Sequence, residues 1–231
     1  MATEAGDGAA DAALARRLQI LSTEHWGLLA ARSTAQSEVL TRIALHLTLV
    51  SAGLVTIGLL GQATGFGSWF PVAALAILGF LTIVGLLTLV RVLTVSEEDF
   101  MYVTAMNRIR GAYADLDPTA ASYFLASASD DQLGMRVTYS FLRHRGSVEQ
   151  VLGSSSMLSI LVNASVGGMF AGGLCAALGV AVGGAVTVGV VVGLSIVVTA
   201  VVYTGYRFTS VWRTYEPLRP SEGPPPYWRR R

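Results

Sequence analysis

The sequence predicts an all-α protein in which four helices cross a membrane as two hairpins, beside a helical cytoplasmic layer. Two observations predict this class. The chain of 231 residues is 52% hydrophobic and only 13% charged, against roughly 25% charged residues in an average soluble domain. Residues 43–90 and 150–206 contain no Asp, Glu or Arg, and the chain contains no Lys. A span needs about 20 apolar residues, so each charge-free interval has room for two.

Each charge-free interval divides at a glycine-rich stretch. The first divides at "GQATGFGSWFP", where three glycines and Pro71 interrupt the helical pattern. Aromatic residues in this stretch are typical of a membrane interface. The second divides near "VGGAV". These breaks predict transmembrane hairpin 1 over residues 43–91, with spans at about 44–61 and 69–90, and transmembrane hairpin 2 over residues 150–207, with spans at about 157–180 and 185–206.

Arginine placement predicts the orientation. Arginines lie before the first span, between the second and third, and after the fourth, whereas neither hairpin turn contains one. The positive-inside rule therefore places both termini and the central segment in the cytoplasm. A composition rich in Ala, Gly, Val and Arg without Lys suggests a bacterial source, and so a bacterial inner membrane. Outside the hairpins we expect a disordered N-terminus (residues 1–10), an amphipathic helix (11–42), a helical segment (92–149) and a Pro- and Arg-rich tail (208–231).

Local patterns refine these segments. In the amphipathic helix, leucines recur near one face, and Glu38 and Arg42 are spaced for an ion pair. The second span should continue as a helix to about Leu116, because Pro118 disfavours helix at the preceding residue and suits the first turn of a short new helix. "SASDDQLG" is predicted as a loop, and a further helix is expected from about residue 147 into the third span.

The stretch "AMNRIRGAY", residues 105–113, contains the first candidate site. At 100° per residue, Tyr102, Met106, Ile109 and Tyr113 form an apolar stripe. Helical phase places Arg110 beside this stripe and Arg108 on the far, solvated side. Arg110, with Asn107 three residues before it, is therefore the candidate for a partly buried ion pair or a ligand contact. A structural helix that packs on the N-terminal helix and a site for an anion or nucleotide are both open.

Other polar residues give weaker signals. Asp130 and Asp131 could ligate a divalent cation, but adjacent carboxylates diverge, and a loop or helix cap fits them better. The three histidines fit no metal-ligand spacing. His46 and Asn163 are the main polar side chains within the spans and are expected to hydrogen-bond between helices; such groups can also mark a pathway. Glycines four apart in hairpin 2 favour close helix packing within the hairpin or between copies of the chain.

The stretches "ILSTEHWGLLAARS", "TLVSAGLVTIGLLGQATGF" and "AMNRIRGAY", followed by "DP", "YF" and "DD", resemble an uncharacterised family of multi-pass membrane proteins common in actinobacteria. The resemblance implies source and topology and supplies no activity. By that likeness, Arg32 and Arg110 are expected to pair with Asp130 or Asp131 and so hold the N-terminal helix on the central segment. The likeness also directs attention to four second-rank positions: Glu24, His25, Trp26 and Arg108.

These observations favour an oligomeric structural or signalling component of the inner membrane. The alternative is a channel or pore-forming effector gated from its cytoplasmic layer. An enzyme is not expected, because no catalytic set, metal spacing or phosphate-binding loop occurs. We expect the lipid bilayer and further copies of the chain as partners, and neither a cofactor nor nucleic acid, since the formal net charge is only +1.

Overall fold

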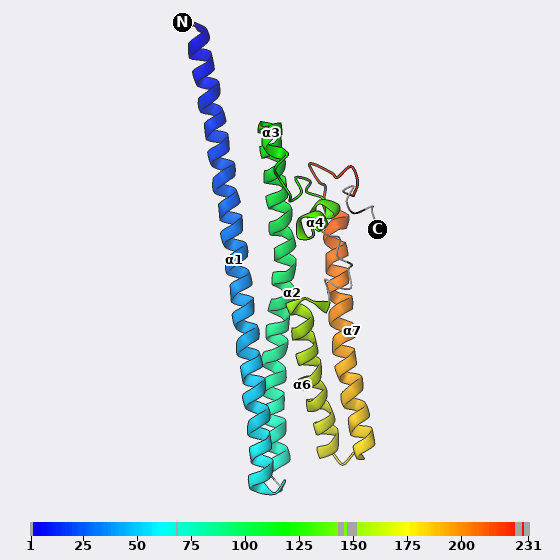
Figure 1. The fold of residues 1–231 in the computed structure, drawn as a ribbon. Coiled ribbons are helices and arrows are strands. Elements are labelled where there is room, and N and C mark those ends of the chain that lie inside the picture. The colour runs from blue at the N-terminus through cyan, green and yellow to red at the C-terminus, as the bar shows by residue number, and fades with distance from the viewer. Residues whose placement is uncertain (1, 68, 143–145, 147–151, 225–227, 229–231) are drawn as a thin grey trace. The chain divides into compact units, whose positions relative to one another are not determined.

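The computed structural model describes residues 2–67, 69–142, 146, 152–224 and 228, and the elements it describes are all helices (Figure 1). Four of them are long and apolar enough to cross a membrane. The predicted all-α class with four such helices is therefore confirmed. In chain order the helices are α1 (Ala2–Thr64), α2 (Phe70–Leu116), α3 (Pro118–Ala121), α4 (Gln132–Tyr139), α6 (Ser155–Ala177) and α7 (Val182–Thr214).

The chain forms two compact units. Unit 1 comprises Met1–Ala35, Glu97–Gly146 and Trp212–Arg231, and unit 2 comprises Gln36–Ser96 and Ser147–Val211. Helices α1, α2 and α7 each contribute residues to both units. Most of the charge-free sequence lies in unit 2, whereas most candidate polar residues lie in unit 1.

Helix α1 is longer than the sequence pattern suggested. The amphipathic helix and the first span were expected as separate elements, but they form one continuous helix, because residues 28–52 contain neither Gly nor Pro to interrupt it. The helix begins at Ala2, within the segment expected to be disordered. Alanine is frequent near this end, and its high helix propensity accounts for the extension.

Helix α2 ends at Leu116, as predicted. The next residue, Asp117, caps the short helix α3: its carboxylate accepts hydrogen bonds from the backbone N–H groups of Thr119 and Ala120, at 2.8 and 3.1 Å, and Pro118 lies in the first turn. The sharp end of α2 thus follows from one Asp-Pro pair. The helix expected from about residue 147 does not run continuously into the third span, because Ser154 caps α6, which begins at Ser155; residues 147–151 lie outside the described part of the chain.

The two hairpins turn by the same hydrogen-bond pattern. After α1, Phe66 N–H bonds to the Gly61 carbonyl at 3.0 Å, and Gly65 adopts a left-handed φ of 58°. After α6, Val180 N–H bonds to the Cys175 carbonyl at 3.0 Å, and Gly179 has a φ of 86°. Both are Schellman caps, in which a residue at positive φ, usually glycine, ends the helix. The second turn therefore precedes the predicted "VGGAV", since α7 already begins at Val182.

Helices α6 and α7 pack backbone to backbone within unit 2. A Cβ atom added at Gly168 would lie 2.7 Å from the Gly189 carbonyl oxygen, and one at Gly189 would lie 2.8 Å from the Gly168 carbonyl oxygen. The approach continues where Gly193 meets the Ala164 carbonyl. The glycine spacing thus serves packing within one hairpin, as predicted, while contact between copies of the chain stays a prediction.

Apolar side chains from α1, α2 and α6 also pack in the interior of unit 2. Val50, Leu78, Leu81 and Val166 form one buried cluster, which Phe170 flanks. An ion-pair group lies on α1 and α2: Glu38 accepts from Arg42, as predicted, and also from Arg91, each at 2.9 Å. These contacts join the two helices of hairpin 1.

Replacing Gly189 with Ala should destabilise unit 2 by about 1–3 kcal/mol, because its Cβ would overlap the α6 backbone. Gly205→Ala is the matched control on α7, since nothing lies within 4 Å of the added atom. Thermal unfolding in detergent, followed by circular dichroism, measures both. Equal unfolding midpoints for the two variants would contradict the close packing.

Candidate functional site

The polar centre of unit 1 is built around Asn107, a fully buried residue of α2. Its Nδ2 donates to the Ser129 carbonyl at 3.0 Å, and its Oδ1 accepts from the Thr138 hydroxyl at 2.8 Å and from Arg110 Nη1 at 2.5 Å. One amide therefore holds the loop before α4, and α4 itself, against α2. Both polar ends of the side chain are satisfied, as burial requires.

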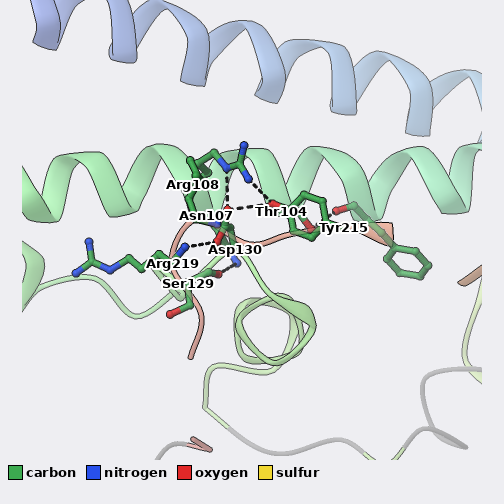
Figure 2. A network of polar contacts seen from close by, with 9 residues as sticks. Thr104, Asn107, Arg108, Ser129, Asp130, Tyr215 and Arg219 are labelled. Atoms are coloured by element: carbon green, nitrogen blue, oxygen red, sulfur yellow. Dashed lines mark hydrogen bonds and ion pairs between the residues drawn. The ribbon is translucent and has the colours of Figure 1, made fainter. Parts of the chain in front are cut away.

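Asp130 is the second fully buried polar residue of this unit. Its carboxylate accepts four hydrogen bonds from residues that are distant in sequence (Figure 2). The donors are Arg108 Nε at 2.7 Å, the Tyr215 hydroxyl at 2.9 Å, and the backbone N–H groups of Leu218 and Arg219 at 3.1 and 2.8 Å. The Asp130 N–H also donates to the Arg219 carbonyl at 3.2 Å. One carboxylate thus connects α2, the loop before α4 and the segment after α7.

The hydrogen bonds to Asp130 lower the pKa of its carboxyl by more than burial raises it. Burial alone would raise the pKa of this carboxyl, but the hydrogen bonds from the Arg219 backbone, Arg108, the Leu218 backbone and Tyr215 lower it below its usual value. The hydrogen bond to Asp130 correspondingly raises the pKa of Arg108. Burial and the same carboxylate raise the pKa of Tyr215. Asp130 is therefore ionised and fully paired.

Asp131 extends the contact with the segment after α7. Its Oδ1 caps α4 by accepting from Gly134 N–H at 2.7 Å, so the predicted cap is confirmed. The Ser221 hydroxyl donates to Oδ1 at 2.7 Å, and Ser221 N–H donates to Oδ2 at 2.9 Å. Helix α4 begins at Gln132, inside the stretch predicted as a loop, because this cap starts the helix earlier. We call residues 215–221 the tail segment.

The expected ion pairs are corrected by these contacts. Arg32 was expected to pair with Asp130 or Asp131; instead its guanidinium forms two bonds with Asp99, at 2.6 and 3.3 Å. The Tyr139 hydroxyl also donates to Asp99, and the Arg32 guanidinium carbon lies 5.9 Å from the centre of the Tyr139 ring. The N-terminal part of α1 is thus joined to α2 by an aspartate of α2 itself and not by the "DD" pair in the loop.

The expected roles of the two arginines in "AMNRIRGAY" are reversed. Arg108, predicted to be solvated, forms the ion pair with Asp130. Arg110, predicted to form a partly buried ion pair or a ligand contact, contacts no carboxylate among the described residues and bonds to the neutral Asn107. The helical wheel located the apolar stripe correctly, since Met106 and Ile109 are buried. It could not include the tail segment, which covers the face that carries Arg108.

Arg110 lies in a positively charged environment. Burial and the neighbouring charge of Arg32 both lower the pKa of its guanidinium. His25 of α1 lies close by: its ring centre is 6.5 Å from that of Tyr113, and burial and the charge of Arg110 lower its pKa. The His25 Nδ1 atom is buried and has no hydrogen-bond partner among the described residues. We call the group formed by Arg32, Arg110 and His25 the cationic cluster.

The remaining candidates are distributed differently. Glu24 and Trp26 are exposed, and Trp26 is 66% accessible, so neither joins the cationic cluster. His46 and Asn163 are buried together in unit 2. Within the described residues, no group of three or more His, Cys, Asp or Glu side chains could hold a metal ion.

Several residues of the network were not anticipated. The sequence indicated no contacts for the Pro- and Arg-rich tail, yet its described part includes Tyr215, Arg219 and Ser221, which bind the aspartate pair. Arg219 also donates to the Gly111 carbonyl and to Asp115, at 2.9 and 2.7 Å. The one sequence feature that could have indicated these contacts is the stretch "TYEPLRPSEG", in which a tyrosine, an arginine and a serine are interspersed with prolines.

Comparison with known proteins gives no assignment: no protein-family model, no curated protein and no solved structure matches this chain. Its class therefore rests on the four apolar helices, which indicate a membrane protein.

Asp130→Asn should release the tail segment. Neutralising this carboxylate weakens the four hydrogen bonds that it accepts by about 3 kcal/mol in sum, equivalent to about 100-fold in an opening equilibrium. Amide hydrogen exchange at Leu218 and Arg219, whose N–H groups donate to Asp130, should accelerate by about that factor. Asp115→Asn is the control, because its carboxylate is 74% exposed. Similar acceleration in both variants would show that Asp130 is not the residue that holds the tail segment.

Stability should decrease as the pH falls from about 7 to about 5, in part through His25. Its pKa is lowered in the folded chain, while the unfolded chain titrates near 6.5. Below that value the unfolded state binds more protons, so acid favours unfolding. Thermal unfolding midpoints across this range should fall less for His25→Gln than for the wild type. Superimposable pH profiles would exclude a contribution from His25.

Proposed function

We propose that the protein is a multi-pass component of a bacterial inner membrane that carries unit 1 in the cytoplasm and binds an anionic group at Arg110. In this proposal it acts as a structural or signalling component. Four helices suited to crossing a membrane support the membrane location. Arginine-free turns after α1 and α6 support cytoplasmic termini, because basic residues are retained on that side.

The observation that carries the anion proposal is the pairing of Arg110. Its guanidinium is half-buried, yet the only side chain that it bonds among the described residues is Asn107, through a neutral oxygen. A guanidinium has five N–H donors, and a single bond to Asn107 leaves most of them unused. A partly desolvated arginine without a counter-charge favours the approach of an anion.

The surroundings of Arg110 strengthen this preference. Asp99, the carboxylate of this region, is occupied by two bonds from Arg32 and one from Tyr139. His25 adds an unpartnered, buried ring nitrogen. The cationic cluster therefore combines two guanidinium groups, one of them neutralised, with an imidazole that can gain a proton. A phosphate group has the charge and the acceptor oxygens to satisfy Arg110 and His25 together.

The closed network on the other face of α2 supports the structural part of the proposal. Asn107 bonds to the loop before α4 with one end and to Arg110 with the other, so the same buried amide that fixes the loop also orients Arg110. A group held in advance loses little conformational freedom on binding. Binding of an anion at Arg110 would in turn act on the contact that joins α2 to α4, as a signalling role requires.

Inorganic pyrophosphate is a suitable first probe for this site. In detergent-solubilised full-length protein it should raise the unfolding temperature in a saturable manner, and Arg110→Gln should weaken binding by about 10-fold or more, the worth of one charge-assisted hydrogen bond. Arg136→Gln is the matched control, because Arg136 is an exposed arginine of the same unit. Sodium chloride at equal ionic strength controls for screening.

Two results would refute this proposal. One is the absence of saturable stabilisation of the wild type by pyrophosphate. The other is an equal loss of affinity in the Arg110→Gln and Arg136→Gln variants, which would indicate diffuse charge attraction rather than a site.

A further inference from the structure

An ion-pair group marks the open end of hairpin 1. Arg42 is the last charged residue before the charge-free interval 43–90, and Arg91 is the first one after it. Both arginines donate to Glu38, Arg42 through Nε and Arg91 through Nη2, each at 2.9 Å. Two arginines that are distant in sequence therefore meet at one carboxylate, at the same level of the hairpin.

The helices between this group and the hairpin turn match the thickness of a bilayer. Residues 43–64 of α1 and residues 70–90 of α2 contain no charged side chain. At 1.5 Å per residue each stretch is about 32 Å long, and the apolar core of a bilayer is about 30 Å thick. When hairpin 1 crosses a membrane, Arg42 and Arg91 therefore lie at the level of the lipid headgroups.

The ion-pair group has a net positive charge. Two arginines share one glutamate, so one positive charge is left over. Glu38 is the only carboxylate among the described residues of unit 2, and no second acidic side chain in that part of the chain can balance the excess. An anion from the surroundings is therefore attracted to this end of the hairpin.

Arg42 retains hydrogen-bond donors for such an anion. A guanidinium has five N–H donors, and Arg42 bonds to Glu38 through Nε. No further bond of this guanidinium is found within the described residues. Its side chain is 52% exposed, against 30% for that of Arg91. Arg42 is thus the more accessible of the two arginines, and a lipid phosphate is the acceptor that a bilayer supplies at this level.

Exposed apolar side chains continue from each arginine toward the hairpin turn. At 100° per residue, Leu45 and Leu49 fall within about 60° of Arg42 on α1, and both are exposed. On α2, the exposed Leu87 falls within the same range of Arg91. Because one carboxylate joins the two arginines, these apolar faces lie on the same side of the hairpin. An acyl chain gains from contact with such a surface, whereas a soluble phosphate does not.

We propose that Arg42 and Arg91, with the apolar faces that continue from them, form a binding site for one anionic phospholipid. The headgroup phosphate accepts hydrogen bonds from Arg42, and the acyl chains lie along the leucines. Glu38 orients both guanidinium groups and, as a like charge, weakens their attraction for the phosphate. The site rests on the membrane location of unit 2 and is independent of the anion proposal for Arg110.

Lipid titration of the full-length protein in detergent tests this site. Native mass spectrometry counts the bound lipids, with phosphatidylglycerol and phosphatidylcholine of the same acyl chains as probes. Phosphatidylglycerol should bind more tightly, and Arg42→Gln should weaken its binding by about 5-fold, the contribution of one arginine near an anionic lipid surface. Arg207→Gln is the matched control and should retain the wild-type affinity, because Arg207 is an exposed arginine directly after the other charge-free interval.

A second variant separates a lipid site from an ion pair that serves only the packing of α1 on α2. Glu38→Gln removes the competing negative charge, so the affinity for phosphatidylglycerol should increase by about 5-fold. A purely structural ion pair predicts no such gain. Glycerol 3-phosphate, which has the headgroup phosphate without acyl chains, should not displace the bound lipid.

Four results would overturn the proposal. They are equal affinities for the two lipids, equal losses in the Arg42→Gln and Arg207→Gln variants, no gain in the Glu38→Gln variant, and displacement of the lipid by glycerol 3-phosphate. None of these results bears on stabilisation by pyrophosphate through Arg110, so the two proposals can fail separately.

Discussion

Burial of one carboxylate determines the arrangement of unit 1. Asp130 is fully enclosed, and an ionised group can be buried only where donors surround it. Its four donors come from α2 and from the tail segment. The segment that follows α7 is therefore part of the folded unit, although its composition resembles that of a disordered arm. Asp131 adds a second attachment through Ser221 while it caps α4.

The same constraint explains the different roles of Arg108 and Arg110. Arg108 neutralises the buried charge of Asp130, so its guanidinium already has an anionic partner and contributes to stability. Arg110 is held by Asn107 and meets no carboxylate among the described residues, which is why we propose it as the anion-binding group. Two arginines separated by one residue thus divide between a closed structural network and an open cationic cluster. Asn107 belongs to both groups, so the side chain that fixes the loop before α4 also orients Arg110 of the cationic cluster.

Unit 2 is stabilised mainly by apolar contacts and close helix packing rather than by a buried polar network. Glycines allow α6 and α7 to approach until backbone meets backbone, so dispersion contacts replace side-chain interdigitation. Against this apolar background, His46 and Asn163 are the buried polar pair, and each directs a polar atom at Gly85. Glycine at position 85 lets these two side chains pack directly against the backbone of α2.

The sequence by itself determined the helical class, the four membrane-crossing helices, the end of α2 at the Asp-Pro pair and the buried stripe through Met106 and Ile109. These features follow from local hydrophobicity, helical period and backbone restriction. The partners of Arg32 and Arg108 were decided only by tertiary structure. Arg32 of α1 meets Asp99 of α2, 67 residues away, and the tail segment reaches α2 from about 100 residues away and covers the side of the helix that the helical wheel assigned to solvent. The convergence of His46 and Asn163 on Gly85 likewise depends on how three helices pack, since helical phase fixes directions within one helix and not what lies opposite.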